Sequence, residues 1–189
     1  MKNTAIVLGD SPFLKEVEDK IRYVLDRYHS IGINNVITKY YTDEHIFLDK
    51  PFIALTNQYL GKTVTLKMYD SLIHKDNKCL LDILSFDFHK HTCKDICNGD
   101  KLAWKGFTHD FAITYCIRQG FKKVILIGAG DFTKGGHFSN PHAFQYSYHC
   151  KENSKKFIEE YASKLIQIET CNPKSYLRVP RVSIDDLLK

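Results

Sequence analysis

The feature that most constrains the fold of this sequence is a short apolar run that ends in a tight polar turn and opens onto an amphipathic pattern. Residues 4–8 (TAIVL) are apolar and β-prone and stop at Gly9, as a buried strand would. From Pro12 to Tyr28, apolar residues recur at three- and four-residue spacing, with Asp10 or Ser11 as the expected helix cap. A strand, a glycine turn and a helix in this order form half of a βαβ unit.

The rest of the chain continues the alternation of strands and helices. A helix is predicted from Thr108 to the stop signal at Gly120, and another over residues 151–163. Further strands are predicted at residues 31–33, 52–56, 63–68, 124–127 and 165–168, and residues 80–84 form another short apolar run. This order predicts one α/β domain over residues 1–189, with a mostly parallel, Rossmann-like sheet flanked by helices. The segment of about 70–107 carries only weak signals.

The composition is that of a globular protein, with 43% hydrophobic and 26% charged residues in 189. The N-terminal apolar run is too short for a signal peptide, and no stretch approaches the roughly 20 apolar residues of a membrane span. We therefore expect a cytoplasmic protein whose six cysteines are thiols. The net charge of +5 suits an anionic ligand. Most charged residues, including the Asp43-Glu44 and Asp185-Asp186 pairs, are expected at the surface.

Two glycine turns follow predicted buried strands. At Gly9-Asp10-Ser11, a helix N-terminus would offer N–H groups to a phosphate, although glycine at such a turn is equally explained by backbone geometry. The second turn, at residues 128–131, is followed by loop-like residues rather than a helix, which argues against a dinucleotide fingerprint. A lid-like loop is expected over about 131–149, with Asp131 as a turn former or, less favoured, an active-site carboxylate.

Metal-binding residue types gather in one stretch of the weakly patterned segment. His89, His91, Cys93 and Cys97 are of the types that bind zinc, but their spacing matches no standard finger and no second pair follows. A solvent-facing loop is the favoured interpretation, and whether the segment of about 70–107 is a lid or binds zinc stays open.

Four stretches, in order, resemble the small bacterial sialyltransferases that use CMP-sialic acid, and more distantly the archaeal-type 6-hydroxymethylpterin diphosphokinases. They are residues 5–16 (AIVLGDSPFLKE), 32–35 (GINN), 107–111 (FTHDF) with 118–128 (RQGFKKVILIG), and 149–153 (HCKEN) with 157–160 (FIEE). The resemblance covers roughly residues 4–60 and 105–172. It implies a GT-A-variant-like fold, and symmetric homo-oligomers are frequent in the family.

The same resemblance implies roles for individual residues. His149 aligns with the family's general base. The segment whose Asn approaches the nucleotide phosphates falls on Asn34 or Asn35, and of these Asn34 is assigned. The nucleotide site implied by the resemblance consists of Gly9, Asp10, Ser11, Asn34, Asn57 and Thr108.

The sequence is thus interpreted as a metal-independent glycosyltransferase with no bound cofactor. It would transfer a sugar from a nucleotide-sugar donor, CMP-linked by the resemblance, to a hydroxyl acceptor on a glycan or small molecule. Two alternatives stay open. One is a pyrophosphate or nucleotidyl transferase on the same scaffold, which would need magnesium near Asp10 or Asp131. The other is a nucleotide-binding module without catalysis.

Overall fold

The computed structural model describes residues 3–130 and 148–189, and for Tyr148 and His149 it describes the backbone alone. The α-helices in these ranges are α1 (Glu18–Arg27), α2 (Lys50–Thr56), α3 (Thr108–Arg118), α4 (Tyr148–Lys156) and α5 (Ile184–Leu187). A π-helical segment, η5 (Phe157–Tyr161), directly follows α4. The strands are β1 (Thr4–Leu8), β2 (His29–Ile33), β3 (Glu44–Phe47), β4 (Lys62–Leu66), β5 (Lys78–Ser85), β6 (Cys97–Asn98), β7 (Lys101–Trp104), β8 (Lys123–Ile127) and β9 (Gln167–Thr170).

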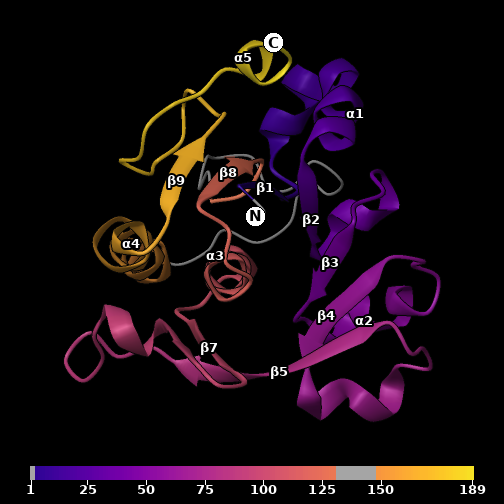
Figure 1. The fold of residues 1–189 in the computed structure, drawn as a ribbon, viewed down its shortest axis with the longest axis vertical. Helices are drawn as coiled ribbons and strands as arrows, with labels where there is room; N and C mark the ends of the chain where they lie inside the picture. The colour runs from indigo at the N-terminus through magenta and orange to yellow at the C-terminus, as the bar shows by residue number, and fades with distance from the viewer. Residues whose placement is uncertain (1–2, 131–147) are drawn as a thin grey trace.

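All of these strands belong to one sheet with the order β6-β7-β5-β4-β3-β2-β1-β8-β9 (Figure 1). Every neighbouring pair is parallel except β6 and β7, which are antiparallel. The predicted α/β class with a mostly parallel sheet is therefore confirmed. All of these strands except β6 run in the same direction, so their carboxyl ends lie at one edge of the sheet. Ligands of open parallel sheets bind at that edge.

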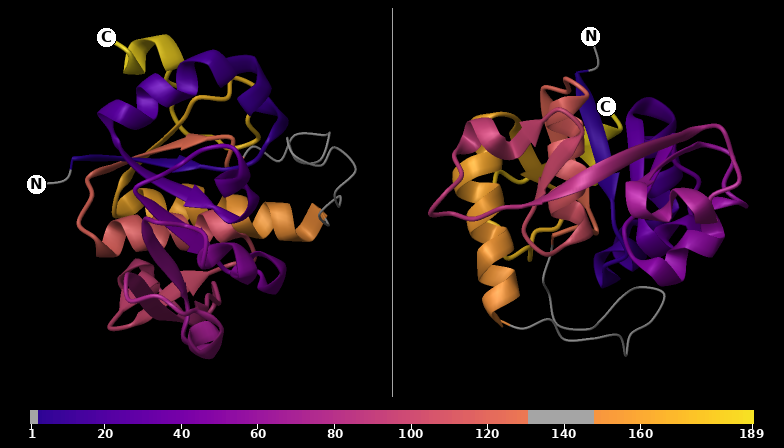
Figure 2. Two further views of the ribbon diagram at one scale, coloured as in Figure 1. Left: turned by 90° about the vertical axis from the view of Figure 1, so that its right-hand side faces the viewer. Right: turned by 90° about the horizontal axis from the view of Figure 1, so that it is seen from below.

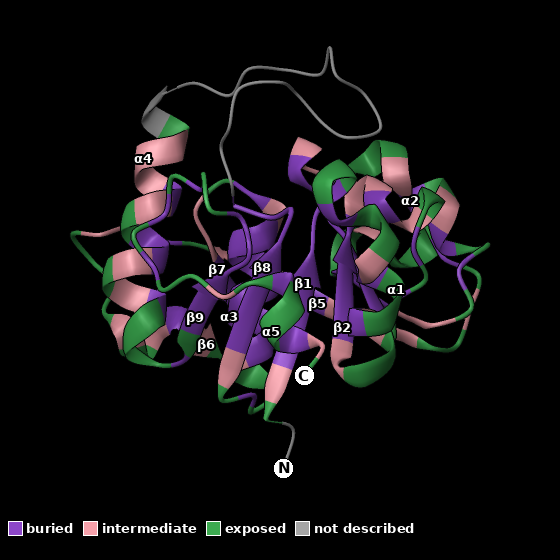
Figure 3. Ribbon diagram, turned by 90° about the horizontal axis from the view of Figure 1, so that it is seen from above, coloured by how far each residue is buried: buried purple, intermediate pink, exposed green. Residues whose placement is uncertain are grey.

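Alternate residues of β1 face two separate cores. Ala5 and Val7 pack in the cluster that contains the buried side of α3, whereas Ile6 and Leu8 pack in the cluster that contains α1 and α5. Figure 2 shows α3 and α4 side by side on one face, with α1 and α5 on the other. In Figure 3 the central strands are buried, and exposed residues lie on the outer sides of the helices. Strands buried on both faces explain the unbroken apolar runs in the sequence.

Several predicted elements differ from the structure. Residues 52–56 were predicted as a strand but form most of α2, whose second residue is Pro51. The helix predicted from Pro12 begins as the 3₁₀ segment η1 (Pro12–Val17), and the α-helix starts only at Glu18. Ser11 does take the N-cap position, without a side-chain capping bond to η1. The apolar spacing thus identified the buried face correctly but not the type of helix.

Three strands, β3, β6 and β7, were not predicted. Within the weakly patterned segment the structure has β5, the 3₁₀ segment η4 (Cys93–Ile96) and the β6–β7 hairpin. The predicted end of α3 at Gly120 is confirmed, since this glycine has a φ of +80° just after the helix. Among the residues described, no helix is both long enough and apolar enough to cross a bilayer.

Candidate functional site

The turn after β1 is built against the turn after β8. The N–H of Gly9 donates to the carbonyl of Ile127 over 2.9 Å, and the N–H of Ser11 donates to that of Gly128 over 3.0 Å. A Cβ at Gly9 would collide with the Gly128 carbonyl and lie 2.9 Å from the Cα of Ala129. Glycine is therefore required at position 9 by the neighbouring backbone. The geometric explanation of this residue is sufficient, without a ligand.

The start of α1 is not at this turn. The six residues of η1 separate Ser11 from the first α-helical residue, Glu18. A phosphate at Gly9-Asp10-Ser11 would therefore not be held by the N-terminus of an α-helix, which corrects the expectation from the sequence. Asp10 is a largely buried residue, and its carboxylate accepts a hydrogen bond of 3.4 Å from the side chain of Asn35.

Asn34 links the turn after β2 to two other elements. Its Nδ2 donates to Oδ2 of Asp49 over 2.7 Å and to Oγ1 of Thr108 over 2.9 Å. Asp49 follows β3, and Thr108 is the first residue of α3. Asn34 also has a φ of +47°, in the left-handed region that asparagine tolerates better than most residues. Its amide therefore joins the ends of β2, β3 and the loop after β7 at one point.

A buried histidine, His45, supports the turn after β2 through a hydrogen bond to its backbone. The ring of His45 is fully buried, and its Nε2–H donates to the backbone carbonyl of Asn34 over 2.9 Å. Burial lowers the pKa of His45 to about 4, although that hydrogen bond raises it, so the ring is neutral at pH 7. A Cβ at Gly32 would collide with the same ring. Glycine at 32 thus leaves space for the histidine that supports Asn34.

A cavity with a volume of about 250 Å³ opens beside Asn34 on the α3 face of the sheet. It extends along the carboxyl ends of five neighbouring strands, from β2 to β7. Its lining consists of Asn34, Leu48, Asp49, Leu66, Ile83, Trp104, Gly106, Phe107 and Thr108. Two of the predicted site residues, Asn34 and Thr108, are among them. Gly9, Asp10 and Ser11 lie at the same edge of the sheet but do not line the cavity.

The first turn of α3 carries a buried polar network directly below Thr108. Ser154 of α4 donates its hydroxyl to Oδ1 of Asp110 over 2.5 Å, and Nε2 of His109 lies 3.1 Å from the same hydroxyl. The other carboxylate oxygen of Asp110 accepts the N–H of Phe107. Burial raises the pKa of Asp110 to about 7, against the lowering effect of these hydrogen bonds, and burial lowers the pKa of His109 to about 3. The network fastens α4 to the N-terminus of α3.

Two other predicted site residues lie outside this geometry. Asn57 follows α2, a helix that starts beside Asp49 and leads away to the beginning of β4, and its Oδ1 accepts the N–H of His74. The structure does not bring Asn57 to the cavity. His149 lies in the first turn of α4, but its side chain is outside the described residues. The predicted lid at about 131–149 and the carboxylate of Asp131 also fall outside them.

Two of the four zinc-type residues, His91 and Cys97, have other partners in the structure. Nδ1 of His91 accepts the N–H of Asp87, and the thiol of Cys97 donates to the carbonyl of Thr114. Within residues 3–130 and 148–189, no three His, Cys, Asp or Glu side chains are grouped to hold a metal ion.

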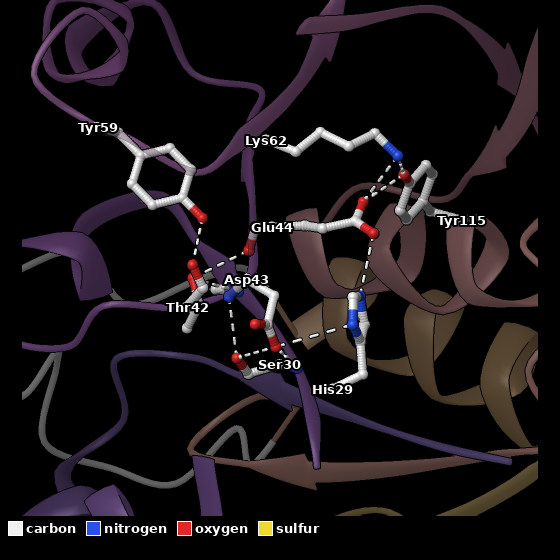
Figure 4. Close-up of polar contacts among 9 residues, drawn as sticks. His29, Ser30, Thr42, Asp43, Glu44, Tyr59, Lys62 and Tyr115 are labelled. Carbon is white, nitrogen blue, oxygen red and sulfur yellow. Dashed lines mark hydrogen bonds and ion pairs between the residues drawn. The ribbon is translucent and has the colours of Figure 1, made fainter. Parts of the chain in front are cut away.

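A second polar cluster lies at the opposite edge of the sheet (Figure 4). Glu44, at the start of β3, accepts bonds from His29 at 3.0 Å, Lys62 at 3.1 Å and Tyr115 at 2.5 Å. Burial alone would raise the pKa of Glu44, but these partners outweigh it and lower the pKa to about 2. The expectation that Glu44 is surface charge was wrong, since the residue is only 4% exposed. The cluster ties the amino ends of β2, β3 and β4 to α3.

Comparison with solved structures identifies the type of fold. The chain is similar to the structure of the MAf glycosyltransferase from Magnetospirillum magneticum AMB-1, with a TM-score of 0.66 and 11% sequence identity. The match covers 98% of this chain but 34% of that one, so the chain spans about a third of its neighbour's length. At this identity the two share a fold. No protein-family model matches the sequence, and neither does any curated protein.

Proposed function

We propose that the chain is a glycosyltransferase that takes a nucleotide-sugar donor at the carboxyl edge of its sheet and passes the sugar to a hydroxyl acceptor. The observation that carries the proposal is the junction of Asn34, Asp49 and Thr108 beside the cavity. Three segments distant in sequence meet there through side-chain hydrogen bonds, at the edge where parallel sheets bind ligands. The fold shared with the MAf glycosyltransferase supports the same class of reaction.

In this proposal the described residues bind and orient the donor. Thr108 and Asn34 contact the nucleotide, and Asp10 and Ser11 shape the turn next to it. His149 takes the proton from the acceptor hydroxyl as that hydroxyl attacks the anomeric carbon of the sugar. The bond between this carbon and the donor phosphate breaks, and the nucleotide leaves with the electron pair. Removal of a proton in this way contributes about 10²- to 10⁴-fold in rate. The resemblance of the sequence to sialyltransferases favours a CMP-linked donor and a reaction without metal.

A magnesium-dependent pyrophosphate or nucleotidyl transfer is the second candidate. Two carboxylates at the carboxyl edge favour it, because Asp10 and Asp49 follow β1 and β3 there. A carboxylate repels a phosphate unless a cation lies between them, and oxygen ligands of this kind suit magnesium.

The test is thermal unfolding of the purified protein with CMP, UMP, GMP, UDP, GDP or ADP, with and without magnesium, followed by assays of donor hydrolysis. A ligand at a hundred times its Kd adds about 2.7 kcal/mol of stability, and for a chain of this length that raises the Tm by roughly 5–10 °C. A metal-independent shift with one nucleotide, and turnover of its sugar conjugate, is the expected result. Strict magnesium dependence would favour the second candidate. Nucleotide binding without turnover of any donor would indicate a module without catalysis.

A further inference from the structure

The cavity beside Asn34 has the chemistry of a site for a neutral ring. Leu48, Leu66 and Ile83 supply aliphatic surface, and Trp104 and Phe107 supply aromatic rings. Among the described lining residues, the one ionisable side chain is the carboxylate of Asp49. None of the described lining residues is basic. An apolar pocket with a few polar groups at its margin fits a planar heterocycle, whereas a phosphate without a cation partner would be repelled by Asp49.

Two neighbouring lysines are directed elsewhere. Nζ of Lys105, the residue after Trp104, donates to the carbonyl of Phe86 over 2.8 Å and lies 4.7 Å from the centre of the Phe88 ring. Lys67, the residue after Leu66, forms ion pairs with Asp82 and Asp100. These cations therefore do not change the acidic character of the cavity.

Two polar atoms of the lining residues are buried without a partner. Nε1 of Trp104 and Oδ1 of Asn34 are shielded from solvent, and neither forms a hydrogen bond within the described part of the chain. Burial of an unpaired donor or acceptor costs stability, so such atoms call for an explanation. One is a donor and the other an acceptor, and both residues line the same cavity. A ligand that carries an acceptor beside an N–H group could satisfy both after a small rotation of the side chains.

We propose that this cavity selects the heterocyclic base of the bound nucleotide, that it favours a base with an exocyclic amino group, and that Trp104 is a specificity-determining residue. The indole N–H of Trp104 donates to an acceptor of the ring. Oδ1 of Asn34 and the carboxylate of Asp49 accept from its amino group. Acceptors outnumber donors among these three groups, which is why an amino group is favoured over a carbonyl at the same ring position. The inference rests on the proposed function only for the presence of a nucleotide at this edge.

The chain offers a direct reporter, because Trp104 is its single tryptophan. We would titrate the protein with two pairs of nucleosides, cytidine against uridine and adenosine against inosine, and follow tryptophan fluorescence. Within each pair the ring size is constant and an amino group is replaced by a carbonyl. The expected result is a fluorescence change for an amino-bearing nucleoside, with a Kd at least tenfold lower than that of its carbonyl partner. Ribose 5-phosphate, which has no base, should leave the fluorescence unchanged.

Two variants keep the test decisive. Trp104→Phe retains an aromatic ring without the N–H, and Asp49→Asn replaces an acceptor by an amide. Calorimetry, which needs no tryptophan, should show at least a fivefold loss of affinity for the preferred nucleoside in the first variant. The second should lose the preference for the amino group. Folding of each is checked by its unfolding transition, and Asn98→Ala, at an exposed position in β6, is the matched control.

The outcomes separate this inference from the proposed function. If a nucleotide-sugar binds and turns over while the fluorescence of Trp104 and the affinity of Trp104→Phe stay unchanged, the base lies elsewhere and the inference is overturned, with the glycosyltransferase proposal intact. Equal binding of both members of each pair also overturns it. If no nucleotide or nucleoside binds in any assay, both proposals fail.

Discussion

The side-chain amide of Asn34 and the hydroxyl of Thr108 are 74 positions apart in sequence and form a hydrogen bond of 2.9 Å. This bond connects the turn after β2 with the N-terminus of α3, directly above the cavity. We expect Asn34→Ala and Thr108→Val each to weaken nucleotide binding at least tenfold. In a double-mutant cycle on unfolding free energy, the pair should show a coupling of roughly 0.5–3 kcal/mol, as contacting residues do. Additive effects on stability would mean that the bond contributes nothing.

Replacement of His149 tests the catalytic assignment. His149→Ala should lower kcat by about 10²- to 10⁴-fold, because the acceptor hydroxyl would lose its proton acceptor, while the Kd of the nucleotide stays the same. The measurement is steady-state kinetics combined with calorimetric titration. The matched control is His89→Ala, an exposed histidine outside the cavity lining. Unchanged turnover in His149→Ala would remove the general-base role.

The buried carboxyl of Asp110 should make stability depend on pH near neutrality. Its folded-state pKa of about 7 lies above the ordinary value of 3.8, so the unfolded chain loses this proton at lower pH than the folded protein does. Protonated Asp110 therefore increases the free energy of unfolding below about pH 4, by up to about 4 kcal/mol. This stabilisation is lost as the pH rises through 7. Urea unfolding of wild type and Asp110→Asn at pH 5, 6, 7 and 8 measures it. The difference between the two proteins should change across this range, and a constant difference would contradict the assignment.

The carboxylate of Glu44 should have the opposite dependence. Its folded-state pKa of about 2 lies below the ordinary 4.5, so its contribution is present above pH 4.5 and is lost as the pH falls toward 2. We expect Glu44→Gln to destabilise the protein at pH 7 by on the order of 2 kcal/mol, because His29, Lys62 and Tyr115 lose their common partner. The difference in unfolding free energy between wild type and Glu44→Gln should become smaller as the pH falls toward 2. Glu160→Gln, at an exposed position, is the control and should change stability little at any pH.

The contact between two turns makes Gly9 intolerant of a side chain. Gly9→Ala should lower the unfolding free energy by about 1–3 kcal/mol or more, since the added methyl group would meet the backbone of residues 128–129. Gly99→Ala is the comparison. That glycine has a φ of +57° but nothing within 4 Å of an added Cβ, so only the cost of a left-handed backbone, about 1–2 kcal/mol, applies. Equal losses in the two variants would show that collision at position 9 is relieved by movement.

The sequence predicted the strands that contain an unbroken apolar run, such as β1 and β8, and missed β3, β6 and β7. β1 and β8 stand out because both faces are buried. β3 was missed because its first residues, Glu44 and His45, are polar yet buried through long-range hydrogen bonds that local patterns do not reveal. Since β3 was missed, Asp49 was not included among the candidate site residues.

The wrong strand at residues 52–56 shows a limit of short apolar runs. Four apolar residues followed by Thr56 do not distinguish a buried strand from a short helix. The helix signal was nevertheless present just before it, as Asp49 at the N-cap and Pro51 in the first turn. The resemblance to a family singled out Asn34 and Thr108, which the structure brings together beside the cavity. Trp104 has no signal in the sequence, because its position in the cavity lining depends on the fold.

The order of strands in the sheet has a consequence for synthesis of the chain. β1, β2, β3, β4, β5 and β7 occupy successive positions in one direction, so each can add to the growing edge as the polypeptide leaves the ribosome. β8 instead pairs with the other side of β1, more than a hundred residues behind it in the chain. Until residue 127 has emerged, one side of the oldest strand stays open. Until then the nascent sheet has two open edges, one at its newest strand and one at the strand that was made first, and both are exposed to aberrant strand pairing.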